Sequence, residues 1–349
     1  MPVAAIHDEL DRALKGPFTL SLSVDLAVEH RFVFLSDQHK GAGDRADEFV
    51  RCKPAYNAAL DHYYEAGYTL VILGDAEELW EQSFRKVEAA HADTLLKEAR
   101  FSASHYYRVW GNHDDAWMDE RVVRRHLRRF MPTGAVYEGI RFEVFDAGEP
   151  VGTMLCVHGH QGTIGSDKLR VVSRFVVRLY RYLQRLTGVG QTTPARDACL
   201  RGRHDREMYE WAATKQGLIL VAGHTHRPVW SSRTHLQMLE DELAALEAET
   251  SLSDGPAPAL FETRRSELRA EIQERAVQHP PCNDSEKAVP CYFNTGCCRY
   301  ESGNITGIEL AHGEIRLVRW RADDHSRQLL ESVEVRSVFE ELGTMGENT

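Results

Sequence analysis

Five short polar segments, each following an apolar run, carry residue types that could bind metal ions. They are Asp37-x-His39, Gly74-Asp75-x-x-Glu78, Gly111-Asn112-His113-Asp114, His158-Gly159-His160 and Gly223-His224-Thr225-His226. Their imidazoles, carboxylates and amide oxygen form a ligand mixture suited to Mn, Fe or Zn. A single His or Asp after a strand usually caps a turn, but this set offers more ligands than one ion needs. The set therefore predicts a site for more than one metal ion.

The spacing within two of these segments bears on how they could reach one cavity. Asp37 and His39 are two residues apart, as are His224 and His226. On an extended backbone, residues at i and i+2 point to the same side. Each pair could therefore aim at a common cavity, and the glycines beside the segments would allow tight turns.

Apolar runs alternate with amphipathic stretches along the chain, which favours a layered α/β or α+β domain. Ligands collect outside the carboxyl ends of strands in open α/β sheets, so the five segments are expected to converge. Helices are expected over residues 46–65 and 77–100. The expected strands are Arg31–Ser36, Thr69–Leu73, Tyr106–Trp110, Met154–Val157 and Leu218–Ala222, with Val289–Asn294, Ile305–Leu310 and Ile315–Trp320 as strands of a second sheet.

Two stretches interrupt this alternation and are predicted to be helical insertions. Residues 164–206 hold ten Lys or Arg against three Asp, and their arginines recur at helical spacing from Arg170 to Arg185. That stripe is either a solvated face, a cap that draws in an anionic substrate, or a surface that lies on anionic lipid. Residues 236–276 are acidic and predict a helical hairpin that serves packing or a homodimer contact. The charged tail after Asp324 is expected to fray.

Composition limits the classes of partner. The chain has 349 residues, with 42 Lys plus Arg against 53 Asp plus Glu, a net charge of −11 that disfavours general nucleic-acid binding. No membrane span or secretory signal is apparent. A cytoplasmic location is expected, with peripheral contact at the inner face of the membrane as an option for the basic insertion.

The cysteines and three further histidines are not predicted to take part in chemistry. Seven Cys do not predict a disulfide scaffold. Cys282, Cys291, Cys297 and Cys298 lack paired Cys-x-x-Cys spacing, so buried thiols are favoured over a zinc site. His105, His126 and His204 are expected to face solvent.

The order and spacing of the five segments resemble the motifs of the calcineurin-like metallophosphoesterases, from about Phe32 to Pro228. Phe293-Asn-Thr-Gly-Cys297 is similar to a turn that follows the last His motif in that family. The resemblance implies a single α/β domain over residues 1–349, a four-layer αββα sandwich with two sheets flanked by helices. The two insertions lie outside the resemblance.

The same resemblance implies roles for individual residues. Asp37, His39 and His226 would hold one divalent ion, Asn112, His158 and His224 the other, and Asp75 would bridge them. Mn is the first choice of metal, with Fe, Zn or Ni as alternatives. Metal-bound hydroxide would attack a phosphoester or phosphoanhydride bond. His113 would protonate the leaving group or stabilise its developing charge, with Glu78 or Asp114 orienting it.

The substrate stays open at this stage. Gly74-Asp75-Ala-Glu-Glu78-Leu-Trp and the basic insertion are similar to the UDP-2,3-diacylglucosamine pyrophosphohydrolase branch. That branch usually has Arg at the position of His113 and Asp at the position of His160. A small phosphorylated molecule is expected: a nucleotide, a phosphodiester or a nucleotide-sugar lipid. His160 either supports a ligand, touches substrate or caps a turn.

A rival from another class is a catalytically silent scaffold that keeps the fold to bind a protein partner through the acidic hairpin. Such a scaffold is expected to lose metal ligands. Here every ligand position that the resemblance implies is filled, which favours the enzyme.

Overall fold

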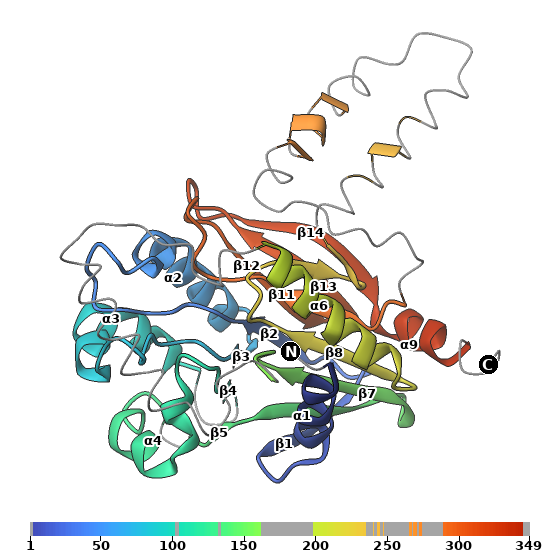
Figure 1. Ribbon diagram of the computed structural model, residues 1–349, viewed down its shortest axis with the longest axis horizontal. Coiled ribbons are helices and arrows are strands. Elements are labelled where there is room, and N and C mark those ends of the chain that lie inside the picture. Colours follow the sequence, from blue (N-terminus) through green and yellow to red (C-terminus); the bar gives the residue numbers. More distant parts are fainter. Residues whose placement is uncertain are drawn as a thin grey trace.

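Two seven-stranded β-sheets form the centre of the computed structural model (Figure 1). The structure describes residues 3–101, 105–131, 134–161, 198–234 and 289–344, together with scattered positions between 240 and 273. Among the described helices, none combines the length and apolar character needed to cross a bilayer.

The first sheet contains the strands that lead into the two His-rich segments. In spatial order it consists of β1 (Thr19–Asp25), β6 (Gly139–Asp146), β7 (Glu149–Val157), β8 (Leu218–Ala222), β11 (Tyr292–Thr295), β9 (Pro228–Trp230) and β10 (Arg233–Thr234). Strands β7, β8 and β11 are parallel neighbours, so their carboxyl ends lie at one edge of the sheet.

The second sheet contains the strands that lead into the other three segments. Its order is β14 (Arg327–Glu334), β13 (Glu314–Trp320), β12 (Ile305–Ala311), β2 (Arg31–Leu35), β3 (Thr69–Leu73), β4 (Tyr106–Val109) and β5 (Val136–Tyr137). Strands β2, β3 and β4 run parallel, which brings residues 36–39, 74–78 and 110–114 to a common edge.

Alternation of side chains along the strands explains the layers. Phe32 and Phe34 of β2 belong to the core between the sheets, where Phe32 packs against Phe142 at 5.1 Å between ring centroids. Val33 and Leu35 point the opposite way, into a cluster with the buried face of α2 (Phe49–Glu65). Apolar residues at both faces make β2 a fully covered strand.

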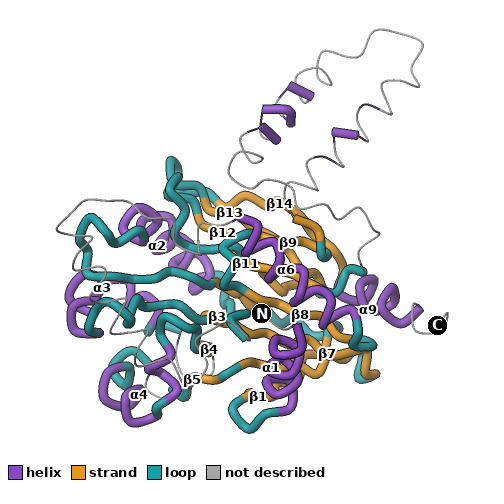
Figure 2. The backbone as a smooth tube through the Cα atoms, in the orientation of Figure 1, coloured by secondary structure: helices purple, strands orange, loops and turns teal. Residues whose placement is uncertain are grey.

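Helices cover the outer faces, so the order of layers is helix, sheet, sheet, helix. Figure 2 shows α2 and α3 on one side of the strands and α6 and α9 on the other. This is the mixed α/β sandwich expected from the sequence. The helices are α1 (Val3–Lys15), α2 (Phe49–Glu65), α3 (Phe84–Glu98), the 3-10 turn η1 (Asp115–Met118), α4 (Glu120–His126), α6 (Ala198–Ala213) and α9 (Val335–Thr344).

Two expectations about the elements were wrong. Helix α3 begins at Phe84 rather than Glu77, because residues 77–83 form a loop that carries Glu78. Strand β11 pairs with β8 in the first sheet, whereas β12 and β13 extend the sheet of β2, so the late strands do not form a sheet of their own.

The described part of the tail, through Thr344, forms β14 and α9, contrary to the expectation that the tail frays. Arg327 donates from Nε and Nη2 to the two carboxylate oxygens of buried Glu309, at 2.7 and 2.6 Å. Phe339 and Leu342 of α9 are buried in the main core. Strand β14 lies at the edge of the second sheet. Charged side chains on such an edge strand oppose its pairing with a strand of another chain.

The structure describes only part of each predicted insertion. Residues 198–206 belong to α6, and the arginine stripe from Arg170 to Arg185 lies outside the described residues. Within 236–276 the described positions include short helical stretches, and Arg269 pairs with Glu247 at 2.6 Å. The rest of that segment lies outside the described residues.

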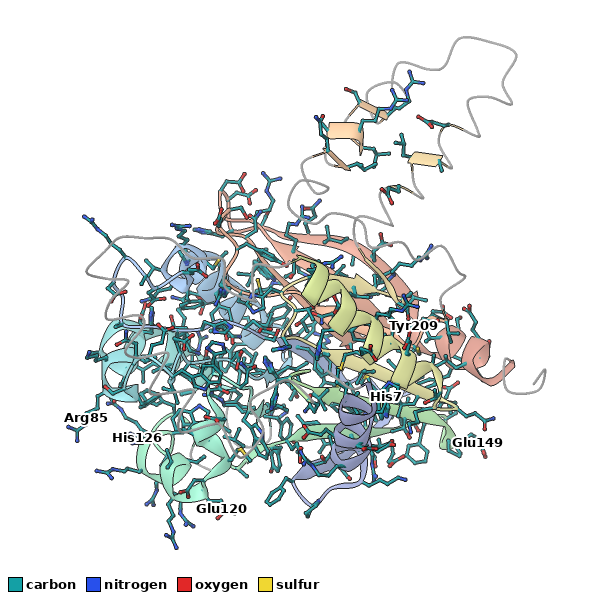
Figure 3. The ribbon with its side chains drawn as sticks, viewed as in Figure 1. His7, Arg85, Glu120, His126, Glu149 and Tyr209 are labelled. Atoms are coloured by element: carbon teal, nitrogen blue, oxygen red, sulfur yellow. The ribbon has the colours of Figure 1, made fainter. Side chains whose placement is uncertain are left out.

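Surface side chains on the outer helices include Arg85 and Glu120, which project away from the sheets in Figure 3. His105 is exposed, as expected, and His126 is half-buried beside Phe84 with ring centroids 5.5 Å apart. The described cysteines 52, 156, 291, 297 and 298 are buried free thiols. Cys282 lies outside the described residues.

Candidate metal centre

Unusual backbone conformations occur at five of the predicted ligands. Asp37, His39, Asp75, His224 and His226 have φ values of 56°, 48°, 50°, 70° and 58°. Non-glycine residues rarely adopt this left-handed region, and such residues cluster at functional sites. The two i, i+2 pairs therefore converge through left-handed turns and not through extended backbone.

Asp37, His39 and His226 form a first group of ligand atoms within 4.8 Å of one another. Oδ1 of Asp37 lies 3.1 Å from Nε2 of His226 and 3.7 Å from Nε2 of His39. The other carboxylate oxygen, Oδ2, accepts the backbone N–H of His224 at 2.9 Å and the hydroxyl of Ser36. These bonds fix the carboxylate so that Oδ1 faces the histidines.

Asp75, His158 and His224 form a second group of the same size. Nε2 of His158 lies 3.2 Å from Oδ2 of Asp75 and 3.3 Å from Oδ1 of Asn112. Nδ1 of His158 is 2.8 Å from the carbonyl of Leu73. That bond orients the imidazole with Nε2 toward the group, as metal-ligating histidines require.

Asp75 connects the two groups. Its Oδ2 lies 3.5 Å from Nε2 of His39 and 3.2 Å from Nε2 of His158. Its Oδ1 accepts the backbone N–H of His113 at 2.7 Å. All seven predicted ligands thus lie together at the edge where the parallel strands of both sheets end.

A family model for the calcineurin-like phosphoesterases matches residues 30–228, more than half of the 349-residue chain. The chain belongs to the calcineurin-like phosphoesterase family. The matched range contains all five polar segments. A search of curated proteins found no match to the chain.

Two buried atoms test whether this phosphoesterase could hold cations. Oδ1 of Asp37 and Nε2 of His39 have no hydrogen-bond partner among the described residues. Nδ1 of His39 lies 3.2 Å from Glu78. When Nδ1–H donates a hydrogen bond to Glu78, the lone pair of Nε2 faces the carboxylates of Asp37 and Asp75. Acceptors facing one another in a buried site are costly without a cation between them. The donor set therefore fits a metal ion.

Electrostatics in the phosphoesterase site point the same way. Burial raises the pKa of Asp37, but His226 and His39 outweigh burial and hold that pKa well below its ordinary value. Burial also raises the pKa of Asp75, and His158 and His113 bring it well below normal. Burial lowers the pKa of His158, whereas Asp75 raises it to about 9. Positive charge is thus strongly favoured between these carboxylates.

His113 lies beside the first group and is held on three sides. Its Nδ1 is 2.8 Å from Oε2 of Glu78. The indole of Trp80 stacks on its ring at 4.6 Å and an interplanar angle of 20°, and His39 meets it edge-on at 4.6 Å. Because Nδ1 is hydrogen-bonded to Glu78, Nε2 is the ring atom left to exchange a proton.

Of the two residues expected to orient His113, only Glu78 contacts its ring. The carboxylate of Asp114 instead accepts the backbone N–H groups of Gly111 and Ala76, at 2.6 and 2.8 Å. Burial raises the pKa of Asp114 to about 7, with Asp75 and Glu77 adding to the increase. Asp114 therefore fixes the loops after β3 and β4 and acts on the backbone, not on His113.

Sequence reasoning missed His204 and Asp205 of α6. His204 was expected to face solvent, which was wrong: its Nε2 bonds the carbonyl of Gly159, and its ring packs 5.1 Å from that of His224. Asp205 accepts the hydroxyls of Thr225 and Tyr292, both at 2.8 Å. Both residues lie at the end of the predicted basic insertion, residues 164–206, and no local pattern in the sequence marks them as part of the site.

The carboxyl end of β11 also supports the site. Nδ2 of Asn294 donates to the carbonyl of Gly223 at 2.7 Å, and the hydroxyl of Thr295 lies 2.7 Å from that of Ser36. His160 lies near His158, with ring centroids 5.3 Å apart. In the described part of the chain, the candidate metal groups include no cysteine.

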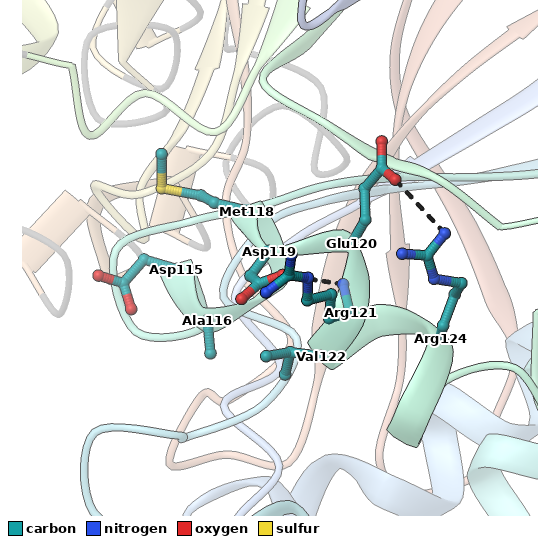
Figure 4. Close-up of a pocket in the computed structure, with 8 residues that line it drawn as sticks. All are labelled: Asp115, Ala116, Met118, Asp119, Glu120, Arg121, Val122 and Arg124. Carbon is teal, nitrogen blue, oxygen red and sulfur yellow. Dashed lines mark hydrogen bonds and ion pairs between the residues drawn. The ribbon is translucent and has the colours of Figure 1, made fainter.

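A separate pocket lies at the η1–α4 turn and is shown in Figure 4. It is lined by Asp115, Ala116, Met118, Asp119, Glu120, Arg121, Val122 and Arg124. None of these residues is a predicted ligand, and Glu120 and Arg124 pair there at 3.7 Å. The pocket is therefore distinct from the metal centre.

Proposed function

We propose that the chain is a binuclear metal-dependent phosphoesterase that hydrolyses a phosphoester or phosphoanhydride bond. The observation that carries the proposal is Asp75, whose Oδ2 lies within 3.5 Å of a histidine from each ligand group. A carboxylate shared by two groups is the arrangement that a bridging ligand requires. The family membership supports the same reaction class.

Asp37, His39 and His226 would hold one ion and Asn112, His158 and His224 the other, with Asp75 between them. Two divalent cations, when bound, acidify water at neutral pH and neutralise charge on phosphoryl oxygens. Mn is our first choice, and Fe, Zn or Ni suit the same oxygen and nitrogen donors.

We assign His113 as the proton donor to the leaving group. Glu78 at 2.8 Å fixes Nδ1, and Trp80 fixes the plane of the ring. Nε2 can then present its proton to the departing oxygen. Burial lowers the pKa of His113, but Glu78 and Asp75 outweigh burial and raise it to about 9. The carboxylate of Glu78 at Nδ1 thus favours the protonated ring that this role needs.

The substrate that we propose is a small phosphorylated molecule: a nucleotide, a phosphodiester or a nucleotide-sugar lipid. Glu78-Leu79-Trp80 and the basic insertion support the nucleotide-sugar lipid, because they are similar to the pyrophosphohydrolase branch. The presence of His113 supports the other two. The cytoplasm, with peripheral membrane contact through residues 164–206, is the location that we propose.

The test begins with protein purified without chelator. Metal analysis is expected to give two ions per chain, and the Mn-loaded protein is expected to hydrolyse aryl phosphodiesters or monoesters. A screen of nucleotides, cyclic nucleotides, nucleotide sugars and lipid-linked pyrophosphates would then identify the substrate class. Two bound ions without turnover of any of these compounds would support the scaffold instead.

A further inference from the structure

Arg299 lies in a segment that leaves the first sheet beside the metal centre. Because β11 is parallel to β8, the residues after β11 emerge at the same edge as the His224–His226 loop. The hydroxyl of Tyr300 donates to the carbonyl of His226 at 3.4 Å. The residue before Tyr300 is therefore held next to a loop that carries two predicted ligands.

A salt bridge directs the Arg299 side chain across to the second sheet. Its Nη2 lies 2.8 Å from Oε2 of Glu48, and the arginine side chain is 22% exposed. Glu48 stands directly before α2, at the end of the loop that starts with Asp37. The guanidinium thus spans the rim between the loops after β11 and β2 while part of it still reaches solvent.

The charge of Arg299 acts on residues from both sides of the centre. Arg299 is among the charged groups close enough to act electrostatically on both His226 and His113. A fixed positive charge near an acid and a metal ligand would attract the anionic part of a substrate.

We propose that Arg299 is a specificity-determining residue that binds the non-leaving oxygens of the substrate phosphoryl group. This inference rests on the proposed function, because it places a phosphoryl group at the metal centre. A guanidinium offers five N–H donors in a plane and binds phosphate through two parallel hydrogen bonds. Glu48 engages Nη2 and holds the plane in place, so less entropy is lost when phosphate binds.

The alternative is that the partly exposed ion pair of Arg299 and Glu48 only joins two loops. Such pairs contribute little to stability, and then neither phosphate affinity nor specificity would depend on Arg299. If Arg299 binds the substrate, its removal should weaken the binding of a terminal phosphate, which carries two negative charges, more than the binding of a phosphodiester, which carries one.

The experiment titrates inorganic phosphate into the Mn-loaded protein by calorimetry, which requires no turnover. Arg299→Ala is expected to weaken phosphate binding about tenfold, which corresponds to about 1.4 kcal/mol, with the Mn content per chain unchanged. Arg299→Lys keeps the charge but not the paired hydrogen bonds and is expected to recover part of the affinity. Glu48→Gln keeps an acceptor oxygen for Nη2 and is therefore expected to retain most of the phosphate affinity.

Arg321→Ala is the matched control, because Arg321 pairs with Asp323 in the turn between β13 and β14. Wild-type phosphate affinity in Arg299→Ala would overturn the proposal. Loss of Mn or of thermal stability in both Arg299 variants would also overturn it, since Arg299 would then be structural. Wild-type protein that binds phosphate without hydrolysing any ester would refute the proposed activity and leave the Arg299 comparison intact.

Discussion

The two halves of the metal centre are held in place by different kinds of interaction. The β2–β4 half, formed by residues 36–40, 74–78 and 110–114, rests on buried ion pairs. Lys40 donates to Glu98 at 2.6 Å and Arg108 donates to Glu77 at 2.5 Å, and all four side chains are buried.

The β7–β8 half, formed by residues 158–160 and 223–226, rests mainly on hydroxyl and amide hydrogen bonds. Asp205 binds Thr225 and Tyr292, and Tyr292 accepts a hydrogen bond from Asn294 at 2.9 Å. The main core continues beneath this half through β8 and α6.

This difference has energetic consequences. Removing one partner of a buried ion pair leaves an uncompensated charge and costs about 3–5 kcal/mol. Leaving a buried hydroxyl or amide group without its hydrogen-bond partner costs about 1–3 kcal/mol. The β2–β4 half should therefore be the more sensitive to single substitutions, although both halves supply ligands to the same centre.

The largest effect is expected from Asp75→Asn, because Asp75 belongs to the second ligand group and also lies 3.5 Å from His39 of the first. The amide keeps the shape but loses the charge that two cations need. Metal analysis is expected to show fewer than two ions per chain, and phosphodiester turnover is expected to fall to background. A variant with two ions and wild-type turnover would show that Asp75 does not bridge the halves.

The second comparison pairs His113 of the β2–β4 half with His204 of the β7–β8 half, since each ring packs on a predicted ligand. His113→Ala is expected to retain both ions and lose about 10²–10⁴-fold in kcat, the usual contribution of a general acid. His204→Ala is expected to lose far less. Loss of an ion from His113→Ala would instead identify His113 as a ligand, a role that its place beside His39 and Asp75 permits.

A third substitution probes the ion pairs directly. Arg108→Leu removes the partner of Glu77 and is expected to lower the free energy of unfolding by about 3–5 kcal/mol, measured by urea denaturation. Lys40, 3.5 Å from Glu77, would compensate only in part. Arg129→Ala removes a partly exposed pair with Glu88 and serves as the control, with a change of at most about 1 kcal/mol. Equal changes in the two variants would contradict the proposed difference.

Local pattern was sufficient to predict the ligand-bearing loops. Strands β3 and β8 have the predicted limits, because each is a short apolar run closed by a glycine and a polar residue. The family's motifs then indicated which side chains meet. The match over residues 30–228 supports that identification.

The supports behind those loops could not be predicted in the same way. Lys40 and Glu98 are separated by 58 residues, and Thr225 and Asp205 come from a strand-end loop and a helix. In the sequence alone, each of these residues looks like an ordinary solvent-exposed polar side chain. Lys40 follows β2 and Glu98 ends α3, so only tertiary packing brings the two together and buries them. The ordered tail depends likewise on Glu309, which Arg327 reaches from the next strand but one.

The smallest effect is expected in the β7–β8 half, from Asp205→Ala. The substitution leaves the hydroxyls of Thr225 and Tyr292 without their shared acceptor, and the expected loss of stability is about 1–3 kcal/mol. Asp205→Asn retains an acceptor oxygen and should lose less. Because Thr225 stands between His224 and His226, weaker Mn binding is also expected, by about 10–100-fold.

Calorimetric Mn titration beside urea denaturation separates these two effects. The control is Glu210→Ala, an exposed substitution on α6 that removes the ion pair with Arg206. If Asp205→Ala matched the loss in Arg108→Leu, the two halves would be equally dependent on their supports, and the division into ionic and hydrogen-bonded halves would have no energetic meaning.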